Sequence, residues 1–379
     1  MLQCLDSYHT SFMDSGDMRD YHKRQNENSD WVRTEVKQLS VAPLDKTSAL
    51  YGDLSLFALG VSEDAVKDTA ENIGLAVKLD GVFHPMRDTA FKSLADRAKI
   101  SGTALPKLKK EELANVFNYC LGLHSASALL LIRDEKVAAI HSGDEKDYSV
   151  LAVNELLDSV LENINIRFPG HEFGGGYADH NLASASWTFP DQKEELLGTY
   201  KKVLDSQGKG AMAAKILPGV RFCTSDTGMA SAKIAATLNG LAYPIHIGGI
   251  LAVEHRGQSK IEDFKKNLDL LFTQFGDAIA MLEKLTTIYL DYPVNAMTAI
   301  CKKLSMPKKA AMEAIAMFEG SMGSGSVTAH DIFMALQEII FILRTEGTPE
   351  GKLLVIEENL SRALAIRWQD FDIAKVVSY

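Results

Sequence analysis

The chain has 379 residues, of which 46% are hydrophobic, 8% aromatic and 24% charged. A chain of this length can form two or three domains. Its composition is that of an ordinary globular protein and excludes a wholly disordered or fibrous chain. The net charge of -10 excludes a protein that coats duplex DNA through an overall basic surface, so any nucleic-acid role must be local.

The cysteines and the first residues indicate the compartment. Cys4, Cys120, Cys223 and Cys301 lie far apart in the sequence, with neither a paired zinc spacing nor the density of a disulfide scaffold. Residues 1–20 lack the apolar core of a signal peptide, and no apolar run approaches the roughly 18 residues of a membrane-spanning helix. The sequence therefore predicts a cytoplasmic protein with reduced thiols and no membrane partner.

Residues 1–50 are polar and predict an arm that is mobile or ordered by a partner. Residues 51–256 predict an α+β core with a mixed or antiparallel sheet, because strand and helix patterns alternate irregularly. Asp80-Gly81 and Asp134-Glu135 separate apolar flanks and predict two hairpins. Predicted helices cover 62–73, 89–99, 109–121, 150–163 and 191–206, and predicted strands include 54–59, 164–168, 183–189 and 243–254.

Residues 257–379 predict a helical C-terminal domain. Its first helix carries apolar residues at alternating spacings of three and four, the period of a coiled coil: Ile261, Phe264, Leu268, Leu271, Phe275, Ala278, Leu282 and Leu285. This seam is either a packing stripe within the chain or the interface of a homo-oligomer. Shorter helices are predicted over 310–318, 328–343 and 353–368, with a glycine- and serine-rich linker at 320–326.

The stretch 215–238 predicts a strand, a polar turn and an Ala-rich helix that begins at Met229. Amides at a helix N-terminus favour phosphate, so the turn is a candidate phosphate or nucleic-acid site. The candidate residues are the turn residues Thr224, Ser225, Thr227 and Gly228 and the cations Lys215, Arg221 and Lys233. The alternative is that Asp226 or Thr227 only caps the helix.

Two aromatic residues, Tyr177 and Trp187, lie near cations in the sequence and could stack on single-stranded bases. The alternative is that both belong to the core, because alternating strands bury one face.

A glycine-rich segment at 174–176 is flanked by His171, Glu172, Asp179 and His180, residue types that bind divalent cations. Their spacing matches no established metal motif, so no metal is expected. Phosphate-binding glycine loops, the dinucleotide fingerprint and the nucleophile elbow are also missing. No cofactor is expected, and the sequence leaves catalysis open while favouring a protein that is not an enzyme.

Three segments carry a resemblance: 137–157 with Ser142 and Tyr148, Gly219 with the turn 224–228, and 328–340. Together they resemble a phage- and plasmid-associated family known only as a domain of unknown function. Ala138 stands where the family has an arginine, and Thr224 and Asp226 stand where it has Asn and Glu. The resemblance implies an origin in a mobile element and a bacterial cytoplasm.

Two classes of function follow. The first is a non-enzymatic protein that binds or anneals single-stranded DNA and assembles into a homo-oligomer through its helical C-terminal region. The second is a nucleotide or small-phosphate binding protein, an enzyme or a host-defence antagonist, that uses the 224–228 turn and the glycine-rich loop. A structural role in a phage assembly is a third possibility.

Overall fold

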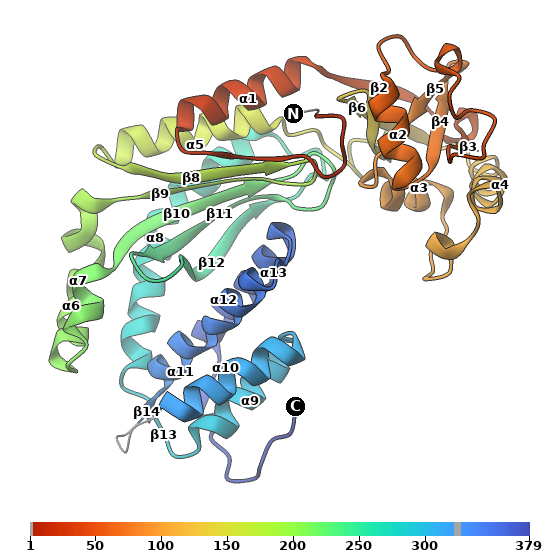
Figure 1. Ribbon diagram of the computed structural model, residues 1–379. Helices are drawn as coiled ribbons and strands as arrows, with labels where there is room; N and C mark the ends of the chain where they lie inside the picture. Colours follow the sequence, from red (N-terminus) through yellow and green to blue (C-terminus); the bar gives the residue numbers. More distant parts are fainter. Residues whose placement is uncertain (1–2, 322–326) are drawn as a thin grey trace.

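The computed structural model describes residues 3–321 and 327–379 and has the predicted α+β fold (Figure 1). A six-stranded antiparallel sheet forms the centre of a large domain, a smaller domain is built on residues 29–142, and a helical bundle follows the large sheet. Residues 322–326 of the predicted linker lie outside the described residues.

The large sheet has the strand order β1-β8-β9-β10-β11-β12, and every neighbouring pair is antiparallel. Period-two alternation divides its side chains between two unlike faces. One face is apolar and carries Trp187, Phe222 and Ile234, while the other carries Arg221 and Lys233. The strands are β1 His9–Phe12, β8 Glu172–Asp179, β9 Ala183–Thr188, β10 Leu217–Thr224, β11 Ala232–Asn239 and β12 Ile245–Val253.

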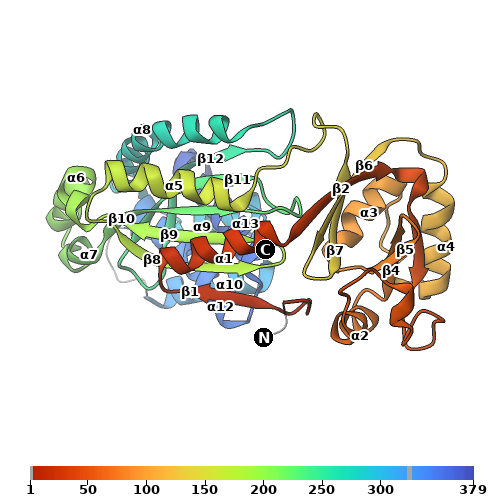
Figure 2. The same ribbon diagram turned by 90° about the horizontal axis from the view of Figure 1, so that it is seen from above.

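Three helices cover the apolar face, namely α1 (Ser15–Glu27), α5 (Val153–Arg167) and the first half of α8 (Ile261–Leu285) (Figure 2). The opposite face is covered by α13 (Glu350–Ser361), which packs on β12. Helices α6 (Lys193–Ser206) and α7 (Gly210–Lys215) connect β9 to β10.

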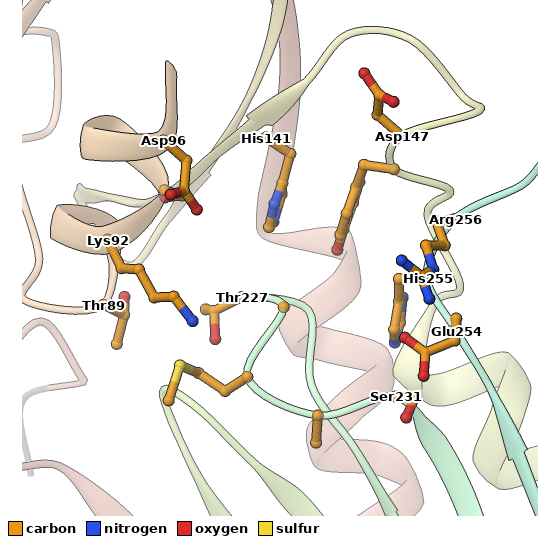
Figure 3. A pocket seen from close by; sticks show the side chains of 15 residues that line it. Thr89, Lys92, Asp96, His141, Asp147, Thr227, Ser231, Glu254, His255 and Arg256 are labelled. Atoms are coloured by element: carbon orange, nitrogen blue, oxygen red, sulfur yellow. The ribbon is translucent and has the colours of Figure 1, made fainter. Parts of the chain in front are cut away.

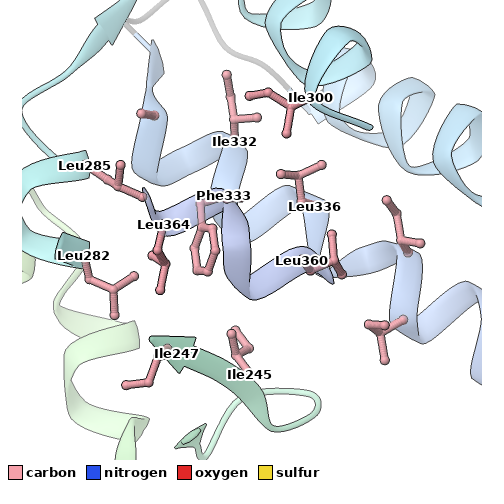
Figure 4. Close-up of a cluster of buried hydrophobic side chains, with 14 of the residues drawn as sticks. Ile245, Ile247, Leu282, Leu285, Ile300, Ile332, Phe333, Leu336, Leu360 and Leu364 are labelled. Carbon is pink, nitrogen blue, oxygen red and sulfur yellow. The ribbon is translucent and has the colours of Figure 1, made fainter. Parts of the chain in front are cut away.

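The C-terminal bundle shares one apolar core with β12 and the second half of α8. Figure 4 shows Ile245 and Ile247 of β12 facing Leu282 of α8 and Phe333 of α11. The bundle consists of α9 Pro293–Lys303, α10 Lys308–Ser321, α11 Ala329–Leu336, α12 Glu338–Thr345 and α13, with the short pair β13 Tyr289–Leu290 and β14 Val327–Thr328 and the 3-10 helices η5 Arg362–Ala365 and η6 Trp368–Phe371.

The predicted heptad seam is one continuous helix, as expected. Phe264 and Leu268 pack on the large sheet, while Phe275 and Leu282 pack in the C-terminal bundle, and all four are buried. The seam is therefore a packing stripe within the chain, because sheet and bundle already cover it. This removes the feature on which the predicted homo-oligomer interface rested.

The small domain contains two three-stranded sheets, β2-β6-β7 and β3-β4-β5, around one apolar core. Both predicted hairpins are confirmed, and their turns Asp80-Gly81 and Asp134-Glu135 have the positive φ angles that tight hairpins require. The elements are β2 Ser29–Glu35, β3 Ser40–Pro43, β4 Leu75–Leu79, β5 Val82–Pro85, β6 Ser127–Arg133, β7 Lys136–Ser142, α2 Glu63–Glu71, α3 Ala90–Ala98 and α4 Lys110–Leu121, with the 3-10 helices η1 Val36–Gln38, η2 Leu54–Leu56 and η3 Leu105–Lys107.

The predicted N-terminal arm is wrong as a separate unit. Residues 3–50 contribute β1 and α1 to the large domain and β2 and β3 to the small one. Asp6 anchors the segment, because its carboxylate pairs with the buried cations Arg87, at 3.3 Å, and Lys136, at 3.0 Å. Polarity misled the prediction here, since the few apolar residues of the segment, such as Phe12 and Met18, are buried in the core of the large domain.

Two predicted strands are also wrong. Residues 54–59 form the 3-10 helix η2 and a loop, and residues 164–168 are the last turn of α5. Both runs are short and apolar, a pattern that does not distinguish a strand from a helix end. Within the described residues, every helix is too short or too polar to cross a membrane.

Candidate functional site

The predicted phosphate turn lies between two strands and has no helix behind it. β10 ends at Thr224, and residues 232–239 form β11, so the predicted helix from Met229 is wrong. The Ala-rich run is a strand because Ala235 and Ala236 are buried between β10 and β12. Ser225, Asp226 and Thr227 are buried in this turn, whereas Gly228 is exposed, and the turn leads into β11 and not into a helix.

The three predicted cations do not converge on that turn. The Arg221 guanidinium pairs with Glu350 and, at 2.9 Å, with Glu357 of α13. Lys233 pairs with Glu358 at 2.6 Å, whereas Lys215 is exposed at the end of α7. Two of the three cations are thus neutralised by one helix, and the third lies at the other end of β10.

The two predicted stacking residues are not exposed platforms. Trp187 is fully buried in the core between the sheet and α5, as the alternative reading holds. Tyr177 is half-buried on β8, and its hydroxyl donates to Asp179 at 2.8 Å.

The predicted glycine loop is part of strand β8. Gly176 packs against Met18 of α1 so closely that a Cβ there would collide with the sulfur. His171 and Glu172 lie at the start of β8, while Asp179 and His180 lie at its end. The described residues contain no group of three or more His, Cys, Asp or Glu side chains that could hold a metal ion.

A pocket of about 220 Å³ lies between the two domains, beside the tip of the predicted turn (Figure 3). Helix α3 of the small domain supplies Thr89, Lys92 and Asp96, and β7 supplies His141. The large domain supplies residues 227–231 of the β10–β11 turn and 254–256 after β12, and the connection that follows β7 supplies Asp147 and Tyr148. The pocket therefore needs both domains in place.

A row of parallel aromatic rings crosses the pocket (Figure 3). His141 and Tyr148 stack with ring centroids 3.5 Å apart and planes 4° from parallel. His255 continues the row at 5.8 Å from Tyr148, and Trp31 of β2 approaches from the side at 6.0 Å from His141. Stacking of this kind holds each ring at a fixed orientation.

Asp226 of the large domain bonds both to the ring row and to the small domain. Its backbone carbonyl accepts hydrogen bonds from His141 Nε2 at 2.9 Å and from the Tyr148 hydroxyl at 2.7 Å. Its carboxylate forms a buried ion pair of 2.5 Å with Arg133 at the end of β6. One residue of the predicted turn thus has a role, but that role is to join the domains.

The hydrogen bond to Asp226 fixes the proton of His141. A carbonyl oxygen only accepts, so Nε2 carries the proton and Nδ1 remains an acceptor. Burial lowers the pKa of His141 to about 4, outweighing the hydrogen bond to Asp226. Burial also lowers the pKa of His255 and, with the nearby Asp226 carboxylate, raises the pKa of Tyr148 well above its usual value. All three rings are neutral at pH 7.

The rim of the pocket is charged and open to solvent. Lys92 and Arg256 are exposed there, and neither forms an ion pair with any residue that the structure describes. Asp96, Asp147 and Glu254 are exposed on the same rim, and Ser231 adds a hydroxyl. The pocket therefore offers two cations, carboxylates, hydroxyls and neutral rings around one small volume.

Sequence reasoning missed most of this site. Lys92, Asp96, Glu254, His255 and Arg256 fit no spaced motif, and they meet only because the two domains pack together. The sequence feature that could have indicated this site was the pair of segments 142–148 and 224–228. These two segments, singled out separately, lie against each other at the pocket.

Comparisons with known proteins add no relative. No protein-family model, no curated protein and no solved structure matches the chain. The resemblance to the phage- and plasmid-associated family stays a prediction.

Proposed function

We propose that the protein binds a small ligand that carries both a phosphate group and a planar ring, of the nucleoside monophosphate type, in the pocket between its domains. The observation that carries the proposal is that two exposed cations without an ion pair to any described residue, Lys92 and Arg256, line the same pocket as the neutral His141–Tyr148–His255 row. This is the nucleotide-binding alternative of the sequence analysis, moved to a different set of residues.

Lys92 and Arg256 suit the phosphate group. They come from different domains and lie at opposite ends of the ring row (Figure 3), so a phosphate group bound at either one would gain a charge-assisted contact. The hydroxyl of Ser231 lies on the same rim and makes no hydrogen bond with the residues that the structure describes. By contrast, the Ser225 and Thr227 hydroxyls bond to each other at 3.0 Å and are already satisfied.

The ring and sugar of such a ligand also find partners. His141 Nδ1 is an acceptor that can receive a hydrogen bond from an exocyclic amine or a ring N–H. Asp96 and Glu254 are carboxylates that can accept hydrogen bonds from sugar hydroxyls. Pocket residues at a domain junction commonly combine aromatic walls with a few polar groups in this way.

The size of the pocket limits the ligand. Drug-sized ligands occupy pockets of roughly 300–1,000 Å³, and this one measures about 220 Å³. A nucleoside monophosphate is therefore favoured over a dinucleotide, and a nucleic-acid strand could place only one nucleotide there.

Most of the residues on which the single-strand DNA hypothesis rested are not available to bind DNA. Arg221 and Lys233 are neutralised, Trp187 is buried, and the turn hydroxyls are internal. It stays a prediction, as do the mobile-element origin, the bacterial cytoplasm and the homo-oligomer. The site supports binding, and nothing in it identifies a reaction.

Isothermal titration calorimetry with the four ribonucleoside 5′-monophosphates tests the proposal. We expect at least one to bind, with the free nucleoside and inorganic phosphate each at least about tenfold weaker, because each lacks half of the contacts. Lys92→Ala should weaken binding by a similar factor. Lys67→Ala, an exposed lysine on α2 outside the pocket, is the matched control and should bind normally. Absence of binding by all four nucleotides at millimolar concentration would refute the proposal.

A further inference from the structure

The connection between α9 and α10 has the length of the turn in a helix-turn-helix motif. α9 ends at Lys303 and α10 begins at Lys308, so the turn has four residues, Leu304 to Pro307. Helix-turn-helix motifs join their helices by turns of three to four residues. α9 and α10 lie in the C-terminal bundle, away from the small domain (Figure 1), and no residue of the turn lines the pocket between the domains.

The turn is tightly specified by its backbone. Ser305 has a left-handed conformation with φ of 55°, which ends α9 abruptly. Its amide donates to the Lys302 carbonyl at 3.1 Å, and the Met306 amide donates to the Cys301 carbonyl at 3.0 Å. Pro307 then precedes α10 and accepts the first hydrogen bond of that helix, from Ala311 at 2.9 Å. Both helices therefore leave the turn at fixed angles.

Packing holds the two helices against a third. Leu304 and Met306 are buried in the turn itself, and Ile300 of α9 and Ala314 of α10 are fully buried beside it. The small residues of α10 permit close approach, and α11 packs on both helices. The result is a three-helix unit that presents the outer side of α10 to solvent.

Positively charged side chains are concentrated at this turn, although the chain as a whole is acidic. Lys302, Lys303, Lys308 and Lys309 are all exposed within eight residues. Lys309 pairs with Glu346 at the surface, and Lys302 Nζ donates to the Ser378 carbonyl at 2.9 Å. Lys303 and Lys308 contact no acidic partner among the residues described. This is the local basic surface that a nucleic-acid role would require in a chain of net charge -10.

One stripe of α10 continues from the lysines. Its exposed positions repeat every four residues, a spacing that lines one helix face: Lys308, Lys309, Met312, Glu313, Ala316 and Met317. A carboxylate can accept from a cytosine amino group, and apolar side chains can contact thymine methyl groups. Phosphates lie on both sides of a major groove, where the lysines at the start of the helix would reach them.

We infer that α9, its turn and α10 form a helix-turn-helix that binds duplex DNA, with the exposed stripe of α10 in the major groove and the four lysines on phosphates. The inference is independent of the pocket and concerns a different face of the molecule. It differs from the single-strand hypothesis in both the ligand and the residues. A protein partner that docks on Met312 and Met317 is the competing occupant.

Fluorescence anisotropy with the full-length protein and a labelled DNA duplex of about 20 base pairs tests the inference at low salt. We expect binding that weakens steeply with salt. The double variant Lys308→Glu/Lys309→Glu should weaken binding at least tenfold and reduce the slope of log K against log salt by about 2. Acidic residues in the first turn of a helix are favourable, so the variant should fold.

The matched control is Lys265→Glu/Lys266→Glu, an adjacent exposed pair in the first half of α8, with the same change of charge. It should bind DNA like the wild type. Loss of binding in both variants would show a general charge effect and overturn the inference. So would equal binding of single strands through the same lysines, or absence of duplex binding at tens of micromolar protein, the outcome expected if the stripe docks a protein instead.

Discussion

Cations in two regions of this molecule have opposite surroundings. On the ionic face of the large sheet, Arg221 and Lys233 lie under α13 and are matched by its glutamates. At the pocket between the domains, Lys92 and Arg256 are exposed and have no ion partner in the described chain. The first pair stabilises the fold, and the second pair is available to a ligand.

The difference shows what decides the role of a basic residue. Arg221 and its partner Glu357 are 136 residues apart, so no local pattern links them. Burial makes their pairing obligatory, because an unpaired buried charge is expensive. Lys92 needs no partner, because water solvates it until a ligand arrives. The predictions below separate these two roles, from the largest effect to the smallest.

Arg221→Glu should have the largest effect on folding. It would place a third carboxylate between Glu350 and Glu357, where burial already raises the pKa of Glu357 despite the arginine beside it. Breaking a buried pair costs about 3–5 kcal/mol, and charge reversal costs more. The midpoint of urea unfolding at pH 7 measures this. A midpoint close to that of the wild type would show that the ionic face is dispensable.

Arg133→Met should destabilise the junction of the domains by about 3–5 kcal/mol, because Asp226 would remain charged and buried without a partner. Adding Asp226→Asn removes that charge and keeps the backbone carbonyl that holds His141 and Tyr148. The double variant should therefore recover most of the loss. A double variant less stable than Arg133→Met would contradict this account of the pair.

Acid should destabilise the protein through its buried histidines. Burial, the largest cause in each case, lowers their pKa values to about 4 for His22, His141 and His330 and to about 3 for His180 and His246. The unfolded chain takes up these protons near pH 6.5 and the folded chain only near pH 4 or below. Stability should therefore be fully present above pH 6.5 and fall as the pH drops toward 4.

His246 offers the sharpest control for that dependence. It lies on the ionic face, 3.5 Å from Glu357, and is neutral at pH 7 because its pKa is about 3. His246→Leu should flatten the fall in stability between pH 6 and pH 4 by about 1 kcal/mol or more, since one unit of pKa shift corresponds to about 1.4 kcal/mol. Denaturant unfolding at a series of pH values measures the slope, and an unchanged slope would refute the assignment.

Lys92→Ala and Arg256→Ala should have the smallest effect on folding. Both side chains are exposed, and substitutions of that kind usually change stability by no more than about 0.5 kcal/mol. The melting temperature of each variant should stay within a few degrees of the wild type while ligand affinity falls. A large loss of stability would place these cations with Arg221 among the structural ones.

Much of the architecture could be predicted from the sequence. The hairpins at Asp80-Gly81 and Asp134-Glu135, the α8 helix and the α+β class follow from turn chemistry and periodicity, which are local. The 232–239 strand could not, because alanine favours helices and only the strands on either side make it a strand. The N-terminal segment was missed because its partners lie far along the chain: Arg87 and Lys136 pair with Asp6, and the cores of both domains bury its scattered apolar residues.

The site was less predictable than the fold. The turn at 224–228 was predicted to bind phosphate in front of a helix, whereas it lies between two strands and contacts the small domain through Asp226. Asp226 accepts its hydrogen bonds through its backbone carbonyl, a group that every residue has. Lys92 and Arg256 line one pocket only because the two domains pack together. The identities of the side chains in the sequence therefore predict neither the hydrogen bonds of the Asp226 carbonyl nor the shared pocket of Lys92 and Arg256.

Hydrogen exchange measured by mass spectrometry, with and without millimolar ribonucleoside 5′-monophosphates, tests the central claim most directly. The account predicts slower exchange in the four segments that line the pocket, 89–96, 141–148, 227–231 and 254–256, and unchanged exchange in α13 over the ionic face. Slower exchange in α13 with none at the pocket, or no change in either region, would contradict it.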